Sequence, residues 1–586
     1  MRVKVAKSKN TENYYVIKSV RQGGKTTSKV VARLGNREEI REKIGKDADV
    51  MAWAKEQAAK LTRQEKERTR KVVRNYDPTK LVSGKRREFL GGNVFIERVM
   101  RELGVPKLCR SIAGKTKITY DLWPIASALA AARVLEPGSK ASACELAGTL
   151  VEQPAIERHH VYRALDVLSG SCDLILSELY KASEKLTRRK RKVLYFDCTN
   201  FFFEIEKEDG FRKYGPSKEH RPNPVVEMGM FMDADGVPLT FCMAPGNESE
   251  QLLMTPLEQK IIDDFGIDKL CVCTDAGLSS MANRRFNSQG GRHFVTATSV
   301  KKMKQDLKEW ALDPAGWSVA GFKKTFRIDD VEEKIEAGSL DGKIKDTTFC
   351  KVKSVREKDK DTGEWFDQTV VVTFSFKHRD YQKSIRDAQI ERARRAIAKD
   401  ASRMERKGAN DFRRLVKRTA VTAEGEVAKT QVYAIDEDAI AEEERYDGFY
   451  ALATSFEDLD VSDLLRVNAQ RWQIEECFRI MKTEFAARPV YLSREERIRA
   501  HFLTCFIALL VYRIIEKKLG DRYTCCEIID TLRSMRFEKI EGEGWAPLYA
   551  RTEITDALHA AFGFRTDYEI VPNADMRRIY RHGKNR

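Results

Sequence analysis

The sequence predicts a protein of several domains, in which a mixed α/β domain follows a small β-hairpin and a helical region. Three observations support this class. The chain has 586 residues, too many for one hydrophobic core. Three β-rich segments from about residue 193 precede alternating helical and strand-like segments. An irregular stretch from about residue 301 to 447 then interrupts the pattern before a strand and two helices complete it.

The composition indicates a basic intracellular protein. Lys and Arg number 106 against 89 Asp and Glu, a net charge of +17, which favours a polyanionic partner such as nucleic acid. The 12 cysteines include no CxxC pair, so we expect reduced thiols and no zinc knuckle. The opening MRVKVAKSKN has no apolar run of a signal peptide, and FLTCFIALLVY is too short to span a bilayer. We therefore expect no membrane partner.

The N-terminal segment predicts a β-hairpin. YYVIKSV and SKVVARLG flank Gly23-Gly24, and this pattern is typical of two strands around a tight turn. From Arg37 to about Arg74 the chain is charged and helical with little apolar face, which indicates a projecting helix or linker. We assign residues 1–89 to this hairpin and charged helix.

Residues 90–186 predict a helical domain. Its helical stretches are short and punctuated by Pro and Gly, as in DLWPIASALAAARVL and IERHHVYRALDVLSG. A DNA end-binding domain and a plain helical scaffold are both compatible with this pattern.

The α/β domain is predicted in two parts, residues 187–300 and 448–519. VLYFDCTNFFFEI, PVVEMGMFMDADG and PLTFCMAPGN read as three antiparallel strands, with Asp235-Gly236 in the turn between the last two. A helix, the strand KLCVCTDAG, another helix and the strand HFVTATSV follow. We expect an insertion domain over residues 301–447, in which strand-like pieces alternate with charged helical ones such as RARRAIAKDASRMERKGANDFRRLVKR. A C-terminal region covers residues 520–586.

Three carboxylates are candidates for chemistry. Asp197 interrupts one apolar strand and Asp275 ends another, where an unpaired carboxylate needs a cation, a metal or exposure. A turn or N-cap role is the ordinary alternative for each aspartate. In RWQIEECFRIMK, Arg471, Glu475 and Lys482 fall on one helical face and Glu476 lies apart, so Glu475 is the better third acid. A solvated charged face is the ordinary alternative there.

Carboxylates from separate elements suit hard cations. Magnesium ions take oxygen ligands and keep some waters and substrate phosphates, so three carboxylates suit two-metal phosphodiester chemistry. We therefore expect two Mg²⁺ ions, for which Mn²⁺ can substitute, held by Asp197, Asp275 and Glu475.

Several motifs in order resemble bacterial insertion-sequence transposases of the DDE type. They are FDCTNFFFEI, RKYGPSKEHRPNP, GMFMDADGVPL, PGNESE, TDAGLSSMANRRF and WQIEECFRIMKTEFAARPVYLSREERIRAHF, between about Leu194 and Lys517. The resemblance implies a ribonuclease H-like core with a β-rich insertion, and Asp197, Asp275 and Glu475 as its catalytic acids. Arg471, Glu475 and Lys482 match the family's Tyr, Arg, Glu, Lys signature, whereas its tyrosine position holds Asn468.

Cations and an amide near these acids are the candidate DNA contacts. An ion pair with Glu475 is the alternative role for Arg471, and a polar hairpin turn is the alternative for the loop RKYGPSKEHRPNP. We interpret His220 as a surface loop residue in preference to a proton-transfer group. A place in the sheet core explains Phe449 and Tyr450 at least as well as stacking on a DNA base does. The candidate DNA-binding residues are Arg471, Lys482, Asn468, Arg212, Lys213, Lys218 and Arg221.

The sequence therefore predicts a DNA transposase. It would bind the terminal inverted repeats of its element, cleave the ends and join them to target DNA, with cut-and-paste movement as the expected outcome. The partners would be double-stranded DNA and a second copy of the chain in a synaptic complex, in a bacterial cytoplasm at the nucleoid. The alternatives are a ribonuclease H-like nuclease without strand transfer and a non-catalytic DNA-binding protein descended from a transposase.

Overall fold

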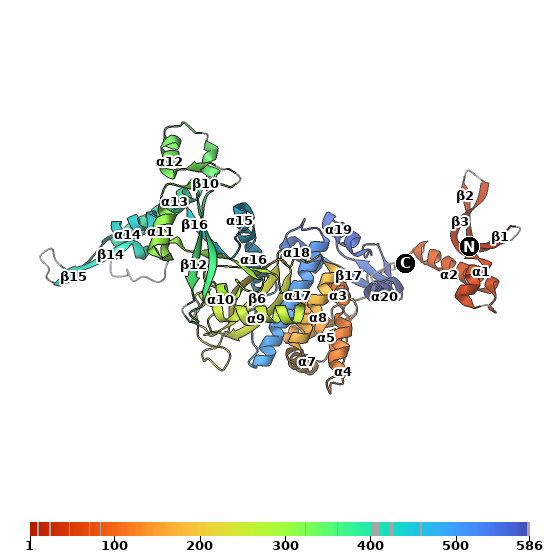
Figure 1. The fold of residues 1–586 in the computed structure, drawn as a ribbon. Coiled ribbons are helices and arrows are strands. Elements are labelled where there is room, and N and C mark those ends of the chain that lie inside the picture. Colours follow the sequence, from red (N-terminus) through yellow and green to blue (C-terminus); the bar gives the residue numbers. More distant parts are fainter. Residues whose placement is uncertain are drawn as a thin grey trace. The chain divides into compact units, whose positions relative to one another are not determined.

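The computed structural model divides the chain into two units, Met1–Arg86 and Arg87–Arg586 (Figure 1). It describes residues 1–582 except 9–10, 23–24, 46, 70, 75, 83, 321, 323, 341, 360, 400–409, 422–426 and 458–459. The predicted Gly23-Gly24 turn and the middle of the charged stretch RARRAIAKDASRMERKGANDFRRLVKR lie outside the described residues.

The N-terminal unit is a three-stranded antiparallel sheet in the order β1-β2-β3, with two helices. Asn36 and Glu39 form a capping box that starts α1 where β3 ends. The small core contains Tyr14, Ile40 and Val50, so the charged helices pack on the sheet through a few apolar residues. The elements are β1 (Arg2–Lys7), β2 (Glu12–Gln22), β3 (Lys25–Asn36), α1 (Arg37–Ile44) and α2 (Val50–Thr69). The sequence prediction did not include β1.

The second unit is built on a ten-stranded mixed sheet in the order β11-β10-β12-β13-β16-β9-β8-β5-β6-β7. β5, β6 and β7 are antiparallel, and β8 and β9 run parallel to β5. Asp235-Gly236 lies in the turn between β6 and β7, and Gly236 has φ 76°. The strands are β5 (Val193–Phe202), β6 (Val225–Asp233), β7 (Pro238–Pro245), β8 (Cys271–Thr274), β9 (His293–Thr298), β10 (Trp317–Val319), β11 (Thr325–Phe326), β12 (Phe349–Lys358), β13 (Trp365–Phe374) and β16 (Phe449–Thr454). The mixed α/β sheet predicted from the sequence is therefore present.

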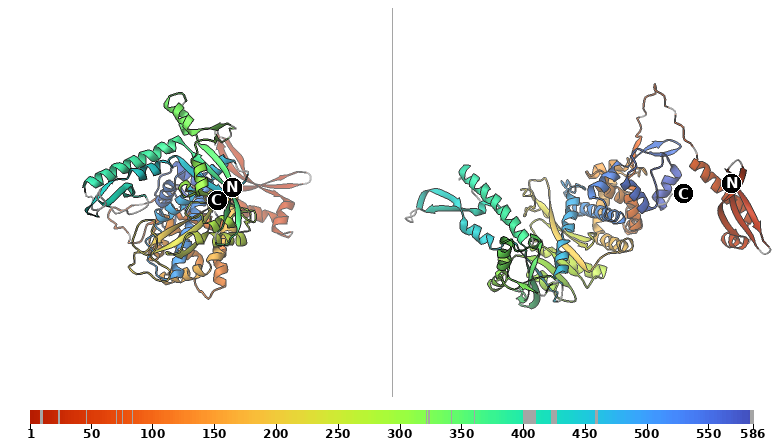
Figure 2. Two further views of the ribbon diagram at one scale, coloured as in Figure 1. Left: turned by 60° about the vertical axis from the view of Figure 1, so that its left-hand side comes forward. Right: turned by 90° about the horizontal axis from the view of Figure 1, so that it is seen from above.

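Strands β10 to β13, which lie within residues 301–447, extend this sheet, and β13 pairs with β16. Apart from these strands, α13 and the β14–β15 hairpin project away from the sheet (Figures 1 and 2). The further elements are η1 (Val300–Lys302), α11 (Gln305–Leu312), α12 (Ile328–Glu336), η2 (Gly342–Asp346), α13 (Phe376–Lys399), η4 (Phe412–Leu415), β14 (Val416–Val421), β15 (Val427–Ile435) and α14 (Glu437–Glu444).

The helix α17 (Glu495–Lys518) is the centre of the largest hydrophobic core, which runs from Phe89 to Tyr580. It packs on the helical region, on β7 and on α16 (Trp472–Lys482). Among the described helices, α17 alone is long and apolar enough to cross a membrane, but 94% of its apolar window is buried in protein, as in a core helix. The helical region contains α3 (Asn93–Glu102), α4 (Val105–Gly114), α5 (Leu122–Leu135), α6 (Lys140–Ala147), α7 (Arg158–Gly170) and α8 (Cys172–Leu186).

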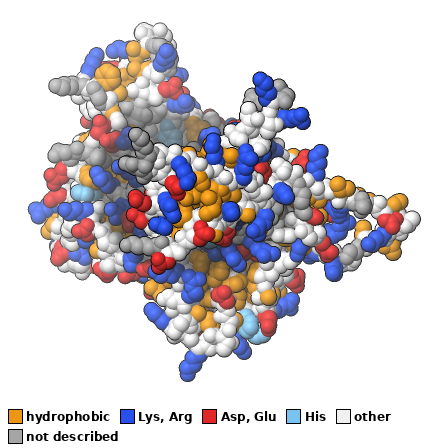
Figure 3. All heavy atoms as spheres, turned by 90° about the vertical axis from the view of Figure 1, so that its right-hand side faces the viewer, with side chains coloured by type: hydrophobic (Ala, Val, Ile, Leu, Met, Phe, Trp, Pro, Cys, Tyr) orange, Lys and Arg blue, Asp and Glu red, His pale blue; other side chains and the backbone are white. Residues whose placement is uncertain are grey.

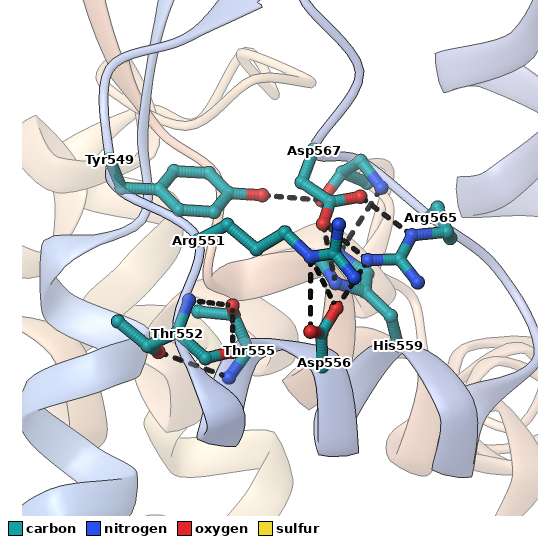
Figure 4. A network of polar contacts seen from close by, with 9 residues as sticks. Tyr549, Arg551, Thr552, Thr555, Asp556, His559, Arg565 and Asp567 are labelled. Atoms are coloured by element: carbon teal, nitrogen blue, oxygen red, sulfur yellow. Dashed lines mark hydrogen bonds and ion pairs between the residues drawn. The ribbon is translucent and has the colours of Figure 1, made fainter.

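The C-terminal region returns to the start of this unit. Strands β17, β18 and β19 join β4 (Glu88–Leu90) in a four-stranded sheet. Around α19, Asp556 binds both Arg551 and Arg565, and Arg565 also binds Asp567 (Figure 4). These ion pairs connect α19 with the segments directly before and after it. The elements are α18 (Cys525–Ser534), β17 (Arg536–Ile540), β18 (Gly544–Pro547), α19 (Glu553–Phe562), β19 (Val571–Pro572) and α20 (Asn573–His582).

The remaining helices lie against the sheet or beside the site described below. α9 (Gln251–Phe265) packs on β7 through a second core that includes Leu257 and Ile261. α10 (Met281–Phe286) and α15 (Val461–Ala469) complete the set.

A buried lysine joins the helical region to α17. Lys140 Nζ lies 3.0 Å from His501 Nδ1, and His501 Nε2 lies 2.9 Å from the Ala487 carbonyl oxygen. Since the carbonyl only accepts, Nε2–H donates to it and Nδ1 accepts from Lys140. Burial, with the nearby charge of Arg133, lowers the pKa of Lys140 to about 7. The unfolded chain holds this proton up to about pH 10.5, so folding becomes more favourable as the pH rises between these values.

We expect Lys140→Met to remove this pH dependence. The free energy of unfolding of the wild type should rise relative to the variant by up to ~1.4 kcal/mol per pH unit above pH ~7. Urea unfolding between pH 7 and 9 measures the difference, and Lys117→Met, at an exposed lysine, is the control with no such trend. A difference independent of pH would show that Lys140 stays charged in the folded protein.

Candidate active site

The pairing of β5 and β8 brings the two aspartates together. The strands are parallel, with Val193 opposite Cys271 and Tyr195 opposite Cys273. Asp197 and Asp275 are each two residues further along, so continuation of this register places them side by side. Asp197 Oδ1 accepts the Cys198 N–H at 2.8 Å, and Asp275 Oδ1 accepts the Leu278 N–H at 2.9 Å. Backbone hydrogen bonds therefore orient both carboxylates, that of Asp197 within β5 and that of Asp275 directly after β8.

Helix α16 supplies the glutamate. Ile474, Phe478 and Met481 are buried, which turns the opposite face of the helix outward. The Glu475 side chain is 59% exposed, and its Oε1 accepts a hydrogen bond from Arg471 Nη2 at 3.2 Å. Glu475 therefore retains most of its lone pairs for another partner.

The neighbouring Glu476 has a structural role. Its Oε2 lies 2.9 Å from Nη2 of Arg513 on α17, and Arg513 Nη1 lies 2.6 Å from Glu516 Oε2. Arg513 is 4% exposed, so this pair is well shielded from water. The contact fixes the rotation of α16 and separates the roles of the two adjacent glutamates.

Arg471 connects all three acids electrostatically. Burial alone would lower its pKa, but the hydrogen bond with Glu475 and the charges of Asp275 and Asp197 raise it. Burial raises the pKa of Asp197 to about 6, and the charge of Asp275 adds to this rise, while Lys218 and Arg471 oppose it. A further positive charge beside these two half-buried carboxylates would therefore favour their ionised forms.

Two lysines lie on the other side of Asp197. Lys218 Nζ donates to the Cys198 carbonyl oxygen and lies 3.0 Å from Glu250 Oε1. Lys482 Nζ lies 5.4 Å from the Phe201 ring centroid, and burial, with the charge of Lys218, lowers the pKa of Lys482 to about 8. Of the loop residues predicted to contact DNA, Lys218 is therefore the one beside Asp197.

The other loop residues have partners of their own. Arg212 Nε lies 2.7 Å from Asp209 Oδ2, and Lys213 Nζ lies 3.2 Å from Glu208 Oε1, as in a polar hairpin turn. The Arg221 guanidinium lies 4.4 Å from the Phe202 ring centroid and is exposed. His220 is exposed with φ 55°.

Three further acids, not singled out from the sequence, lie near the lysines. Glu219 Oε1 lies 3.5 Å from Lys482 Nζ. Glu227 on β6 stands opposite Asn200, whose Nδ2 lies 3.3 Å from Glu227 Oε1. Burial, with the charge of Glu250, raises the pKa of Glu227 to about 7. A single carboxylate inside the apolar run VVEMGM is the same signal that identified Asp197, and PGNESE contains Glu250.

Tyr450 reaches the site from β16. Its hydroxyl accepts a hydrogen bond from Asn468 Nδ2 at 3.0 Å. Burial raises the pKa of Tyr450, while this hydrogen bond and the charge of Arg471 oppose the rise. Phe449 instead packs in the core, 5.0 Å from the ring of Phe374. A cavity of about 860 Å³ opens beside Tyr450, between β16 and α13, and Tyr381 and Lys301 also line it.

Asp197, Asp275 and Glu475 offer oxygen ligands of the kind that magnesium takes, and Arg471 acts on all three. Their ligand atoms do not all lie within 4.8 Å of one another, as those of Glu157, His159 and His160 do among the described residues. Lys218, Lys482 and Arg471 cannot ligate a metal but can bind phosphate oxygens beside one.

The mixed α/β sheet carries Asp197 within β5 and Asp275 directly after β8, and α16 carries Glu475, which is the arrangement expected of a DDE-type core. The family model for the transposase DDE domain matches residues 188–511, more than half of the chain, so this protein belongs to the DDE transposase family. No curated protein matches it. A solved structure of the piggyBac transposase synaptic complex with hairpin DNA is similar at a TM-score of 0.35 and 8% identity, over 85% of this chain and 86% of that one. That TM-score is too low to compare details of the fold.

We expect Arg513→Met to loosen α16. The change leaves the carboxylates of Glu476 and Glu516 without their buried partner, which costs ~3–5 kcal/mol of unfolding free energy. Arg479→Met removes an exposed cation 3.5 Å from the same Glu476 and should cost under ~1 kcal/mol. Urea unfolding of both variants makes the comparison, and equal costs would contradict the bracing role of Arg513.

Proposed function

We propose that this transposase binds the terminal inverted repeats of a bacterial insertion sequence and catalyses metal-dependent cleavage and strand transfer, in a cut-and-paste reaction. The observation that carries the proposal is the gathering of Asp197 and Asp275 at one sheet edge, with Arg471 between them and Glu475. Water attacks the phosphorus at the element boundary and the 3′ oxygen leaves as a hydroxyl. That hydroxyl then attacks a target phosphodiester and displaces its 3′ oxygen.

Asp197, Asp275 and Glu475 would hold two Mg²⁺ ions, for which Mn²⁺ can substitute. Bound there, the ions activate the attacking oxygen and stabilise the leaving one. The chain's own contribution is to hold the three carboxylates in register and ionised. Arg471 does this for Glu475 by a hydrogen bond and for the aspartates by its charge.

The DNA backbone would contact the cations around the acids. Arg471 and Lys482 lie on the same helix as Glu475 or at its start, and Lys218 lies beside Asp197. Asn468, held by Tyr450, can donate to a phosphate oxygen. Arg221 is exposed for such a contact, whereas Arg212 and Lys213 would first have to leave Asp209 and Glu208.

The core is proposed to be ribonuclease H-like, in two parts at residues 187–300 and 448–519 around the insertion at 301–447. Three antiparallel strands followed by two parallel ones, in the order β7-β6-β5-β8-β9, support this assignment. Residues 1–89 and 90–186 are proposed for end recognition, residues 520–586 as a C-terminal brace, and a homodimer as the synaptic form. The reaction would take place at the nucleoid, in the cytoplasm.

Each of Asp197→Asn, Asp275→Asn and Glu475→Gln should abolish cleavage. Loss of a metal ligand removes several kcal/mol of transition-state stabilisation, a rate loss of ~1,000-fold or more. A labelled duplex carrying the element end, with Mg²⁺, measures cleavage, and a gel shift in EDTA measures binding, which should persist. Glu476→Gln is the matched control, because its amide still binds Arg513. Full cleavage by any of the first three variants would remove that residue from the metal site.

Strand transfer is tested with a pre-cleaved end bearing a free 3′ hydroxyl and a supercoiled target. We expect Mg²⁺-dependent joined products that EDTA abolishes, because the same carboxylates serve both steps. Cleavage of intact ends without any joining would instead identify a nuclease. Binding without cleavage in Mg²⁺ and Mn²⁺ would identify a non-catalytic DNA-binding protein.

A further inference from the structure

The net positive charge of the chain is concentrated in its N-terminal unit. Residues 1–86 contain 24 Lys and Arg against 10 Asp and Glu, a net charge of +14 out of +17 for the whole chain. Residues 87–586 contain 82 against 79, a net charge of only +3. Basic and acidic side chains are interspersed on the face drawn in Figure 3. The excess of basic residues is therefore located by counting along the chain.

Within the unit the charge is on the sheet. Residues 1–36, which form the three strands, contain nine Lys and Arg and one acid, Glu12. That acid is already paired, 3.0 Å from Lys7 and 3.5 Å from Arg37. Residues 37–69, which form the helices, contain nine basic and eight acidic residues and are nearly neutral. The helices therefore cover one face of a strongly basic sheet without neutralising it.

The β2–β3 hairpin extends past these helices as a two-stranded ribbon (Figure 1). In β3 every residue from Lys25 to Val31 is exposed, as is Arg33, so both faces of the ribbon are open there. Val30 is 54% exposed, although a β-branched strand residue normally packs. The base of the ribbon packs on the helices, where Lys18 of β2 is ion-paired with Glu65 of α2, whereas the part of β3 from Lys25 to Val31 is exposed.

The ribbon has side chains that can contact a groove of duplex DNA. Lys25, Lys29, Arg33 and Arg21 are exposed, and none is within ion-pair distance of a carboxylate in the described part of the unit. Hydroxyl groups lie between them, on Ser19, Thr26, Thr27 and Ser28. Cations bind phosphates and hydroxyls bind both phosphates and base edges. The major groove of B-DNA is wide enough for a two-stranded ribbon.

We propose that the β2–β3 ribbon docks in the major groove of duplex DNA and is the main DNA-binding surface of the N-terminal unit. The proposal deepens the end-binding part of the proposed function and rests on it. The nearly neutral second unit then performs the chemistry on ends that the ribbon has captured. Each exposed cation of the ribbon that neutralises a phosphate contributes to the salt dependence of binding.

The test compares two triple variants of the full-length protein that lose the same charge. Lys25→Gln/Lys29→Gln/Arg33→Gln changes the ribbon, and Lys55→Gln/Lys60→Gln/Arg63→Gln changes exposed cations of α2. Fluorescence anisotropy in EDTA measures Kd for the element end and for a random duplex over a range of salt concentrations. The ribbon variant should bind the end ~10-fold or more weakly, with a slope of log Kd against log salt reduced by about two to three. The helix variant should stay within about threefold of the wild type.

The outcomes separate this proposal from the proposed function. Equal losses in both variants, or no loss in the ribbon variant while the wild type selects the end, would overturn the ribbon assignment and leave the function standing. A wild type that neither selects nor cleaves the end would overturn the function itself. Circular dichroism of both variants checks folding. Methylation of guanine N7, which lies in the major groove, should block binding by the wild type at certain positions, and methylation at those positions should not affect binding by the ribbon variant. Ribbon-dependent binding to anionic vesicles in place of duplex would also reject the proposal.

Discussion

The burial of α17 is the constraint on which the second unit depends. Its apolar residues face the sheet on one side and the helical region on the other, so one core includes residues from Phe89 to Tyr580. A charged residue on this helix, Arg513, then holds Glu476 and so sets the rotation of α16. The position of Glu475 thus follows from the packing of α16 against α17.

Repulsion between like charges has to be offset at this site. The parallel pairing of β5 and β8 brings Asp197 and Asp275 to adjacent positions, although their negative charges repel each other. Arg471 lowers the cost by lying between them and Glu475, and Lys218 and Lys482 act from the other side. Such a cluster of opposite charges holds its carboxylates ready for divalent cations and its cations ready for phosphate oxygens.

The net charge and the proposed chemistry are divided between the two units. Almost all of the net positive charge is in the first 86 residues, whereas the second unit is nearly balanced. A nearly neutral unit gains little non-specific affinity for DNA from its net charge, because that affinity comes from phosphate neutralisation. Separation of capture from chemistry would limit cleavage to DNA that the basic unit already holds.

The sequence by itself predicted the main strands of the core sheet and the helix that carries Glu475, and it proposed Asp197, Asp275 and Glu475 as the acids. Apolar alternation marked the core strands, and helical periodicity selected Glu475 over Glu476, because both depend only on local geometry. Only the tertiary structure decided the partners. It paired Arg212 and Lys213 within their own loop and brought Glu227 and Glu250 to the lysines. It also joined strands β10 to β13 to the core sheet and merged the helical region with α17. Such contacts join residues far apart in the chain, and no local pattern specifies which of many carboxylates a given cation will meet.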